Sequence, residues 1–525
     1  MLYNKDFIGE LSRYLDDKSV LRLSTTCKVM NEMLKKSLLY VKTDHHKKFL
    51  DYVALKSAVF EGYQMDRYPQ SLRSLKINNV GNPEPAVLPD TLTDLTVVGH
   101  VYEGRDRGTQ LSQFTALPIS LVRLSVEAIL IMNMGNFVNM ESLSFIYMEN
   151  GVLDEEPFIL PPNLTSLAIG SQLERNEVGV KAKRIWPALP QTLKALTLKI
   201  DPSDDFGVRV ANLPKGLTSL SFNAPDVTLD DNDRFNEGLT TLSIKMLDDE
   251  GSDEYYAKLI PFSLTNLRIF SNCIYANDFL PMLPKSVTDI TLDGPMWLSN
   301  FDEEFPKNIK RLKMPFLSQM ISIGGFENLP RDFEELSFSS SCRSVIHEYE
   351  FKNLPISLTA ISGVEFQSGG MADLSHLKSL TSMDGVLVRG VVVELPPNLL
   401  YFNGELPTST VLPESLRELN LNWSSFSNDE NRGGEFLGDI PKSVTKLNIE
   451  KLTVRKAPKI VCESITHLRV YRFFTMYDSI EETCKELKEM FPRIEYVFIN
   501  EYGAEIESGL DGSWWEMTGP KAKEN

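Results

Sequence analysis

The chain has 525 residues, of which 42% are hydrophobic, and a formal net charge of −18. This composition predicts a folded protein, and the acidic balance argues against binding to nucleic acid or to an anionic membrane, because both need clustered Lys and Arg. The cysteines lie far apart and include no C-x-x-C pair, which argues against a disulfide framework or a zinc site and favours a reducing compartment; they are Cys27, Cys273, Cys342, Cys462 and Cys484.

The first predicted element is a pair of short helices within residues 5–37, "KDFIGELSRYLDDKSVLRLSTTCKVMNEMLKKS". Apolar residues recur there at helical spacing; the first stripe is Phe7, Ile8, Leu11 and Leu15, and the second is Leu23, Cys27, Met30 and Leu34. Residues 16–19 form the predicted turn between them. Charges interrupt this N-terminal stretch, so we do not expect it to act as a signal peptide. No run in the sequence approaches 18 apolar residues, so no membrane span is expected.

The stretch "YLDDKSVLRLSTTCKVMNEML" resembles an F-box, although the opening Leu-Pro of that family is absent and Met30 replaces its frequent Trp. The resemblance implies that residues 1–37 dock the adaptor subunit of a cullin–RING ubiquitin ligase. The apolar residues expected at that interface are Phe7, Leu11, Leu15, Val20, Leu21 and Leu23. The alternative is that these helices only cap the repeats that follow. Residues 38–67 are expected to form a connector and N-terminal cap.

Residues 68–476 repeat one phrase, L-P-x-s-L-x-x-L-x-Φ, where s is a turn-forming residue and Φ is apolar. Successive units start about 23 residues apart, within the roughly 20–29 residue period of leucine-rich repeats. The starts are Tyr68, Leu88, Leu117, Leu160, Leu189, Leu213, Phe235, Ile260, Leu283, Phe305, Leu329, Leu354, Leu395, Leu412, Ile440 and Val461, with degenerate copies near Asn136 and Asp373.

Each position of the phrase has a physical reason. Proline at position two starts a turn, and Ser, Thr, Asn, Asp or Gly at position four completes it. The apolar pair at positions eight and ten has a period of two, which predicts a short strand with one buried face. One unit cannot bury its own leucines, so units must stack. The predicted fold is an α/β repeat solenoid, a horseshoe with a parallel concave sheet, preceded by the small helical segment.

The phrases "LPKGLTSLSF" and "IPFSLTNLRI" resemble leucine-rich repeats, and most closely the FNIP-type repeats of F-box proteins from amoebae and from large DNA viruses. The companion "FNQ" stretch of that subclass is missing between the cores. Residues 477–500 predict a C-terminal cap, a helix followed by a last strand, with Ile480, Cys484, Leu487 and Phe491 on its apolar face. In the tail, 501–525, Trp514 and Trp515 either fold back on the last repeat or act as a free ligand.

Catalytic chemistry has no visible basis in this sequence. No zinc-protease, nucleophile-elbow, phosphate-loop or dinucleotide pattern occurs. The acidic stretches "LDDN" and "DDEGSDE" lack calcium-ligand spacing and are interpreted as solvated loops. Some bacterial ubiquitin ligases carry similar repeats, but they need a large cysteine-bearing domain after them, and few residues follow the last predicted strand here. We therefore expect no enzyme activity, no cofactor and no metal site.

Positions seven, nine and eleven of each unit should face away from the buried leucines. They are mostly small in the units that start at 160, 189 and 213, and become aromatic, amide or charged towards the C-terminus. The predicted target-binding residues are Tyr401, Asn420, Trp423, His467, Arg469 and Tyr471. A second candidate patch consists of Arg268, Phe270, Arg311 and Lys313.

Together these expectations describe a protein–protein interaction module. The first hypothesis is a substrate receptor, in which the F-box-like segment binds the adaptor and the repeats bind an unknown target protein. The second is a scaffold or a structural protein of an assembly such as a virion, with helices that serve only as a cap. The expected location is the cytoplasm or nucleus, or the host cytoplasm or the virion for a viral protein.

Overall fold

The computed structural model describes residues 40–43, 57–61, 68–78, 87–98, 116–129, 134–148, 159–172, 188–199, 210–222, 234–245, 258–270, 274–275, 280–293, 296–297, 306–314, 325–339, 344–389, 392–407, 410–421, 440–454, 461–475, 487–501, 504–508 and 514–517. They belong to two units, taken separately below. Unit 1 comprises residues 1–245 and 259–264, and unit 2 comprises residues 246–258 and 265–525. The predicted helices of residues 5–37 lie outside the described residues, and so do all six predicted adaptor-binding residues.

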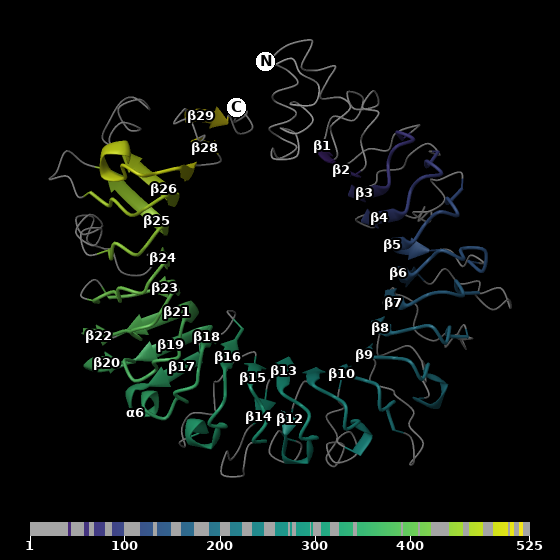
Figure 1. The fold of residues 1–525 in the computed structure, drawn as a ribbon, viewed down its shortest axis with the longest axis horizontal. Helices are drawn as coiled ribbons and strands as arrows, with labels where there is room; N and C mark the ends of the chain where they lie inside the picture. The colour runs from purple at the N-terminus through teal and green to yellow at the C-terminus, as the bar shows by residue number, and fades with distance from the viewer. Residues whose placement is uncertain are drawn as a thin grey trace, which may run out of the picture. The chain divides into compact units, whose positions relative to one another are not determined.

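Unit 1 is a ladder of short parallel strands in chain order, one for each repeat (Figure 1). Its strands are β1 (Tyr40–Thr43), β2 (Ser57–Glu61), β3 (Ser74–Asn78), β4 (Asp94–Val98), β5 (Arg123–Ile129), β6 (Ser142–Met148), β7 (Ser166–Gln172), β8 (Ala195–Lys199), β9 (Ser219–Phe222) and β10 (Thr241–Lys245). Each strand pairs in parallel with the next. The first two fall in the predicted connector, so the sheet begins before the first recognisable repeat.

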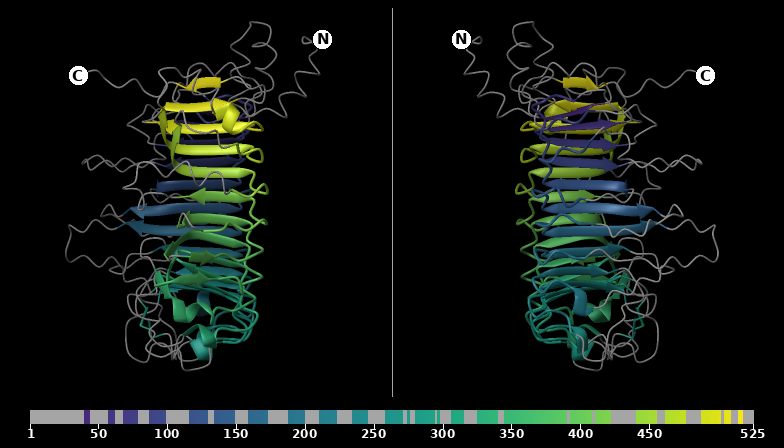
Figure 2. Two further views of the ribbon diagram at one scale, coloured as in Figure 1. Left: turned by 90° about the vertical axis from the view of Figure 1, so that its left-hand side faces the viewer. Right: turned by 90° about the vertical axis from the view of Figure 1, so that its right-hand side faces the viewer.

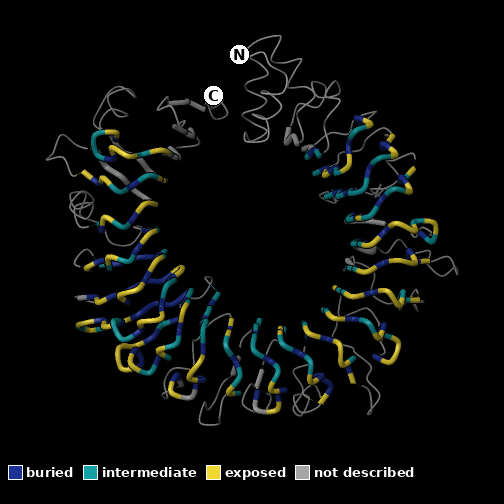
Figure 3. Tube along the Cα trace, in the orientation of Figure 1, coloured by how far each residue is buried: buried dark blue, intermediate teal, exposed yellow. Residues whose placement is uncertain are grey.

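The register of this ladder places position eight of every repeat in one buried row. The row runs through Leu75, Leu95, Leu124, Leu143, Leu167, Leu196, Leu220 and Leu242, all of them almost fully buried. Burial alternates along β3, β4, β8, β9 and β10 (Figure 3). Each buried leucine contributes roughly 2–3 kcal/mol by its removal from water, and the neighbouring repeat provides the surface that covers it.

Unit 2 continues the same plan with more elaborate repeats. Its main ladder runs in parallel through β11 (Asn266–Phe270), β13 (Asp289–Asp293), β15 (Arg311–Met314), β16 (Glu335–Phe338), β18 (Ala360–Ser362), β21 (Ser382–Arg389), β23 (Tyr401–Glu405), β24 (Glu418–Leu421), β25 (Lys446–Val454), β26 (His467–Thr475) and β27 (Tyr496–Glu501). Figure 2 shows these strands stacked one after another.

Shorter strands accompany this ladder. Parallel pairs form between β12 (Ile274–Tyr275) and β14 (Met296–Trp297), between β20 (Met371–Asp373) and β22 (Val392–Glu394), and between β17 (Ser344–His347) and β19 (Val364–Gln367). After β27 the chain reverses into β28 (Ala504–Ser508) and β29 (Trp514–Met517), which pair antiparallel. The segment with Trp514 and Trp515 therefore folds back as a strand.

Helix is short wherever the described residues contain it. The elements are α6 (Glu348–Phe351) and the 3-10 turns η3 (Val210–Asn212), η4 (Leu280–Met282) and η6 (Gly325–Asn328). At the predicted C-terminal cap, residues 487–490 are helical, and Leu487 and Phe491 are buried as expected. The described residues therefore form a parallel leucine-rich-repeat solenoid in which turns and short helical segments, rather than long helices, precede the strands.

The repeated proline opens a β-turn, as its position predicts. The carbonyl oxygen of Pro89 accepts the N–H of Leu92 at 3.0 Å, and that of Pro355 accepts the N–H of Leu358 at 3.0 Å. The leucine that closes each turn enters the core, with Leu92 and Leu358 fully buried. The turn therefore sets the direction in which the following strand leaves.

The turn-former at position four does more than its local propensity suggests, because in many of the described repeats its side chain bonds to the preceding repeat. Ser286 and Ser443 are exceptions, since their buried hydroxyls have no hydrogen-bond partner among the described residues. The hydroxyl of Ser120 donates to the carbonyl of Leu92 at 2.6 Å, and that of Ser357 donates to Phe333 at 2.7 Å. Thr192, Ser263 and Ser415 make equivalent bonds, and Asn308 and Asn398 bond to carbonyls two residues earlier in the preceding turn. These bonds satisfy turn carbonyls that the strands cannot reach, so position four joins consecutive repeats.

Candidate binding surface

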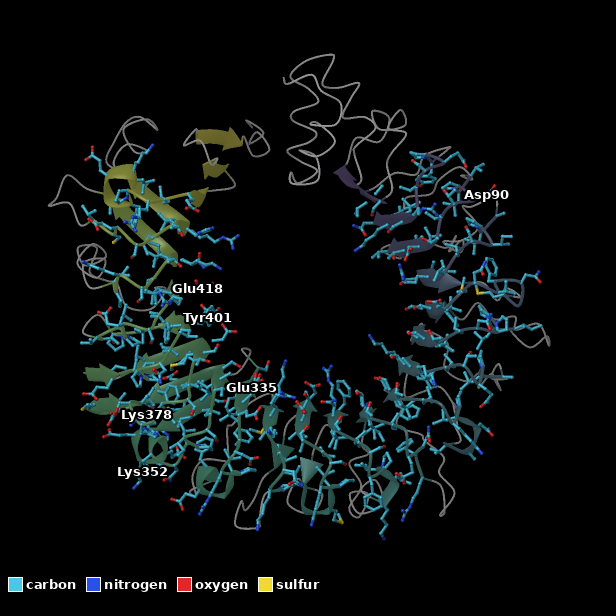
Figure 4. All side chains as sticks on the ribbon, viewed as in Figure 1. Asp90, Glu335, Lys352, Lys378, Tyr401 and Glu418 are labelled. Atoms are coloured by element: carbon cyan, nitrogen blue, oxygen red, sulfur yellow. The ribbon has the colours of Figure 1, made fainter. Side chains whose placement is uncertain are left out.

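Strand alternation in unit 2 leaves two rows of side chains on the face opposite the core. We call the C-terminal part of this face, on β21 to β26, the concave patch. In register its first row is Ser382, Tyr401, Glu418, Lys446 and His467, and its second row is Asp384, Asn403, Asn420, Asn448 and Arg469. Figure 4 shows Tyr401 and Glu418 on the inner side of the curved sheet of unit 2, with Lys352 and Lys378 on its outer side.

A hydrogen-bonded chain, which we call the amide row, crosses four strands of the concave patch. Asn403 Nδ2 donates to Asp384 Oδ1 at 2.7 Å, and the Tyr401 hydroxyl donates to the same oxygen at 3.3 Å. Asn420 Nδ2 donates to the Tyr401 hydroxyl oxygen at 3.2 Å, and Asn448 Nδ2 donates to Asn420 Oδ1. These side chains therefore support one another before any partner arrives.

Tyr401 stands at the centre of this chain and is half-buried. Burial raises the pKa of its phenol, and the nearby carboxylates of Asp384 and Glu418 raise the pKa further, while the bond from Asn420 acts in the opposite direction. The phenol is therefore neutral at physiological pH, and its hydroxyl can donate a hydrogen bond to Asp384. With the hydroxyl engaged on both sides, the ring offers a fixed apolar contact.

Ionisable residues complete the two rows of the concave patch. Glu418 and Lys446 face each other at 3.5 Å, with side chains 30% and 55% exposed, so their attraction is largely screened by solvent. His467 and Arg469 are exposed and follow Lys446 and Asn448 in register. The Nδ1 atom of His467 lies 2.9 Å from the hydroxyl of Thr466.

Tyr401, Asn420, His467 and Arg469 thus share one face of one sheet, as the repeat positions predict. Trp423 lies outside the described residues. Tyr471 belongs to β26, but its side chain is not among the described ones. Asp384 was missed by sequence reasoning because the repeat near Asp373 is degenerate; the signal that could have found it is the "DG" pair after the strand core in "TSMDGV".

The second predicted patch is neutralised by its own neighbours. The guanidinium of Arg268 stacks over the ring of Phe270 at 4.6 Å and pairs with Asp293, while Arg311 pairs with Asp289. Lys313 is exposed beside them. Ion pairs within the face reduce the positive potential that the sequence suggests, so this patch is a weaker candidate than the amide row.

On unit 1 the equivalent face carries small side chains from β6 to β10, where position seven is Ser142, Ser166, Ala195, Ser219 and Thr241. Such side chains offer little area to a partner. In unit 2, burial raises the pKa of the Cys462 thiol to about 11, so it stays protonated and unreactive at neutral pH.

Two further searches concern only the part of the chain that the structure describes. Within it, no group of three or more His, Cys, Asp or Glu side chains could hold a metal ion. No helix there has the length and apolar character needed to cross a lipid bilayer.

Comparison with known proteins finds similar solved structures and assigns no activity. No protein-family model matches the chain, and no curated protein matches it. One similar solved structure is CroV588, described as a novel circular leucine-rich-repeat protein and derived from a giant virus; it is 18% identical with a TM-score of 0.38, over 81% of this chain and 73% of that one. Another is TLR13 in complex with ssRNA13, which is 12% identical with a TM-score of 0.36, over 88% of this chain and 74% of that one.

Proposed function

We propose that this chain is a non-catalytic binding scaffold that holds a target protein against the concave patch of unit 2. The observation that supports this most directly is the amide row, in which four side-chain hydrogen bonds hold Tyr401 and three asparagines in place. Binding normally costs conformational entropy for each side chain that becomes ordered. Side chains that are already held by one another avoid part of that cost.

The chemistry of the patch favours a protein partner. Tyrosine supplies apolar area at low entropic cost, and asparagine supplies adaptable hydrogen bonds, a combination typical of surfaces that bind proteins. The net charge of −18 disfavours nucleic acid, whose phosphates require clustered cations.

We further propose that the F-box-like segment connects this scaffold to a ubiquitin ligase. The support is the sequence of residues 1–37, in which apolar stripes at helical spacing could enter a groove of an adaptor. In that role the chain recruits the target, and the ligase modifies it. The competing proposal is a scaffold or virion component without an adaptor.

One affinity-capture experiment with the full chain as bait separates these proposals. The bait is compared with a Tyr401→Ala/Asn420→Ala variant, a Leu21→Asp variant, and Lys378→Ala, which changes an exposed residue on the outer side of the same unit. Recovered proteins are quantified by mass spectrometry. Retained denaturation midpoints establish that each bait is folded.

We expect the double variant to lose at least about tenfold of its target, because anchors of this kind contribute about 1–2 kcal/mol each, while Lys378→Ala captures as wild type does. Leu21→Asp should lose adaptor and cullin but keep the target, since a buried unpaired charge is costly. A target captured equally by wild type and the double variant would place the binding site elsewhere. Target capture without any adaptor in the wild type would favour the plain scaffold.

A further inference from the structure

The amide row ends at a carboxylate, Asp384, that lies beside an irregularity in β21. Within β21 the buried Met383 pairs with Phe402, and the buried Val386 pairs with Gly404, so two residues of β21 lie opposite the single residue Asn403. This is a β-bulge. Both bulged residues, Asp384 and Gly385, are exposed, whereas strict alternation would turn the second of them inward.

Two glycines make the bulge possible. Gly385 has a φ of 60°, which L-residues with side chains adopt only at a cost. Gly404, on the facing strand, has a φ of 154°, and an added Cβ would lie 1.7 Å from the carbonyl oxygen of Val386. The backbones therefore approach more closely than any side chain allows. The carbonyl of Asp384 is also held, because it accepts the N–H of Gly363 at 2.9 Å.

The carboxylate of Asp384, at the β21 end of the amide row, sets the direction of each hydrogen bond along the row. An ionised carboxylate only accepts, so both Asn403 and Tyr401 must donate to it. Tyr401 has one proton, and once that proton is committed, its oxygen can only accept from Asn420. Asn420 must then turn its NH₂ group towards Tyr401 and its carbonyl oxygen away, and that oxygen receives the NH₂ group of Asn448.

From this chain of constraints we propose that Asp384 is the positioning residue of the concave patch, and that it fixes which hydrogen-bond donors and acceptors the patch offers to a partner. The amide groups of an asparagine could otherwise rotate by half a turn, which exchanges donor and acceptor. A patch with a fixed pattern rejects partners whose groups do not match it, because unmatched polar groups lose their water without compensation. This role in specificity rests on the proposed binding function, but the positioning itself does not.

The proposal can be tested by measuring the hydrogen-bonded side chains of the amide row in the absence of any partner. Asparagine side chains of the full chain are labelled with ¹⁵N, and the NH₂ signals of Asn403, Asn420 and Asn448 are assigned by single replacement with serine. The variants are Asp384→Asn, which keeps the shape of the side chain but can both donate and accept, Tyr401→Phe, which removes the hydroxyl in the middle of the relay, and the two combined.

We expect Asp384→Asn to shift the NH₂ signals of Asn420 and Asn448, although Asp384 contacts neither, and the same change in the Tyr401→Phe background to leave both unchanged. If Asp384 only supported local structure, Asp384→Asn would shift the NH₂ signals of Asn403 alone, or would cause the same shifts with and without the Tyr401 hydroxyl. Either of those results overturns the proposal. The proposal is also overturned if the NH₂ signals of Asn448 do not change in Asp384→Asn alone.

A second readout is the titration of Tyr401, followed by ¹⁹F NMR of 3-fluorotyrosine and assigned by its absence in Tyr401→Phe. Burial raises the pKa of this phenol, and the carboxylate of Asp384 adds to the increase. In Asp384→Asn the titration midpoint should therefore fall, while burial keeps it above the ordinary range. An unchanged midpoint contradicts the contact. Failed target capture would instead contradict the proposed function and leave both spectroscopic results intact.

Discussion

At the scale of the single residue, Gly404 carries the sharpest steric constraint among the described glycines. A methyl group there would overlap the carbonyl oxygen of Val386, and its φ of 154° is unfavourable for alanine. We predict that Gly404→Ala destabilises unit 2 by about 3 kcal/mol, at the upper end of the usual effect of overpacking. The measurement is the urea midpoint of unfolding.

Gly369 provides the matched control. No atom lies within 4 Å of a Cβ added there, and so Gly369→Ala should change the free energy of unfolding by no more than about 0.5 kcal/mol. Equal midpoints for the two alanine variants would mean that β21 and β23 can move apart at little cost. In that case the bulge would not be the rigid support on which the position of Asp384 depends.

At the scale of the element, the turn at the start of many described repeats is also hydrogen-bonded to the repeat before it. Ser357 is the clearest case, since its hydroxyl donates to the carbonyl oxygen of Phe333 across the boundary between two repeats. Ser357→Ala leaves that carbonyl oxygen without its partner and should cost about 1 kcal/mol. Ser357→Thr keeps the hydroxyl and should retain most of the stability, because Thr91 and Thr192 make the same kind of bond.

Chemical denaturation of both variants checks this prediction. If Ser357→Ala and Ser357→Thr lower the free energy of unfolding equally, stability at this position depends on side-chain size and not on the hydrogen bond. If alanine costs nothing, water replaces the hydroxyl at the boundary. Since other repeats make equivalent bonds, a confirmed cost at Ser357 would apply to a repeated feature of the solenoid.

At the scale of the whole molecule, a destabilising substitution in a solenoid should mainly affect the repeat that carries it and the adjacent repeats, because each repeat contacts mainly the ones beside it. Leu196 in β8 is almost fully buried and pairs with Leu167 and Leu220 on either side. Leu196→Ala should cost about 3 kcal/mol locally. Hydrogen exchange followed by mass spectrometry should show the largest acceleration in β7, β8 and β9, and progressively less towards β3.

A uniform acceleration from β3 to β10 would contradict this prediction, since it would mean that unit 1 unfolds as one cooperative body. The exposed Ile119 is the control in the same unit, with 71% of its surface accessible. Ile119→Ala should leave the exchange pattern unchanged. The comparison thus separates loss of core packing from loss of an apolar residue as such.

The sequence by itself determined the repeat, its turns and its buried face. These depend on contacts between residues close in the chain, such as the bond from Leu92 to Pro89, and on an alternation of period two that the sheet cannot shift without exposing its leucines. The same alternation placed Tyr401, Asn420, His467 and Arg469 on one face. Where the unit is degenerate, near Asp373, the pattern is too weak to place residues.

Only the tertiary structure decided which side chains meet across strands. The bulge beside Asp384 requires Gly385 in β21 at positive φ and Gly404 in the next repeat, whose backbone lies against Val386. The neutralisation of Arg268 likewise depends on Asp293 in the following strand. Such contacts join residues some twenty positions apart in the chain. A repeat pattern records the strands but not these partnerships, because each depends on side-chain geometry that the repeat leaves free.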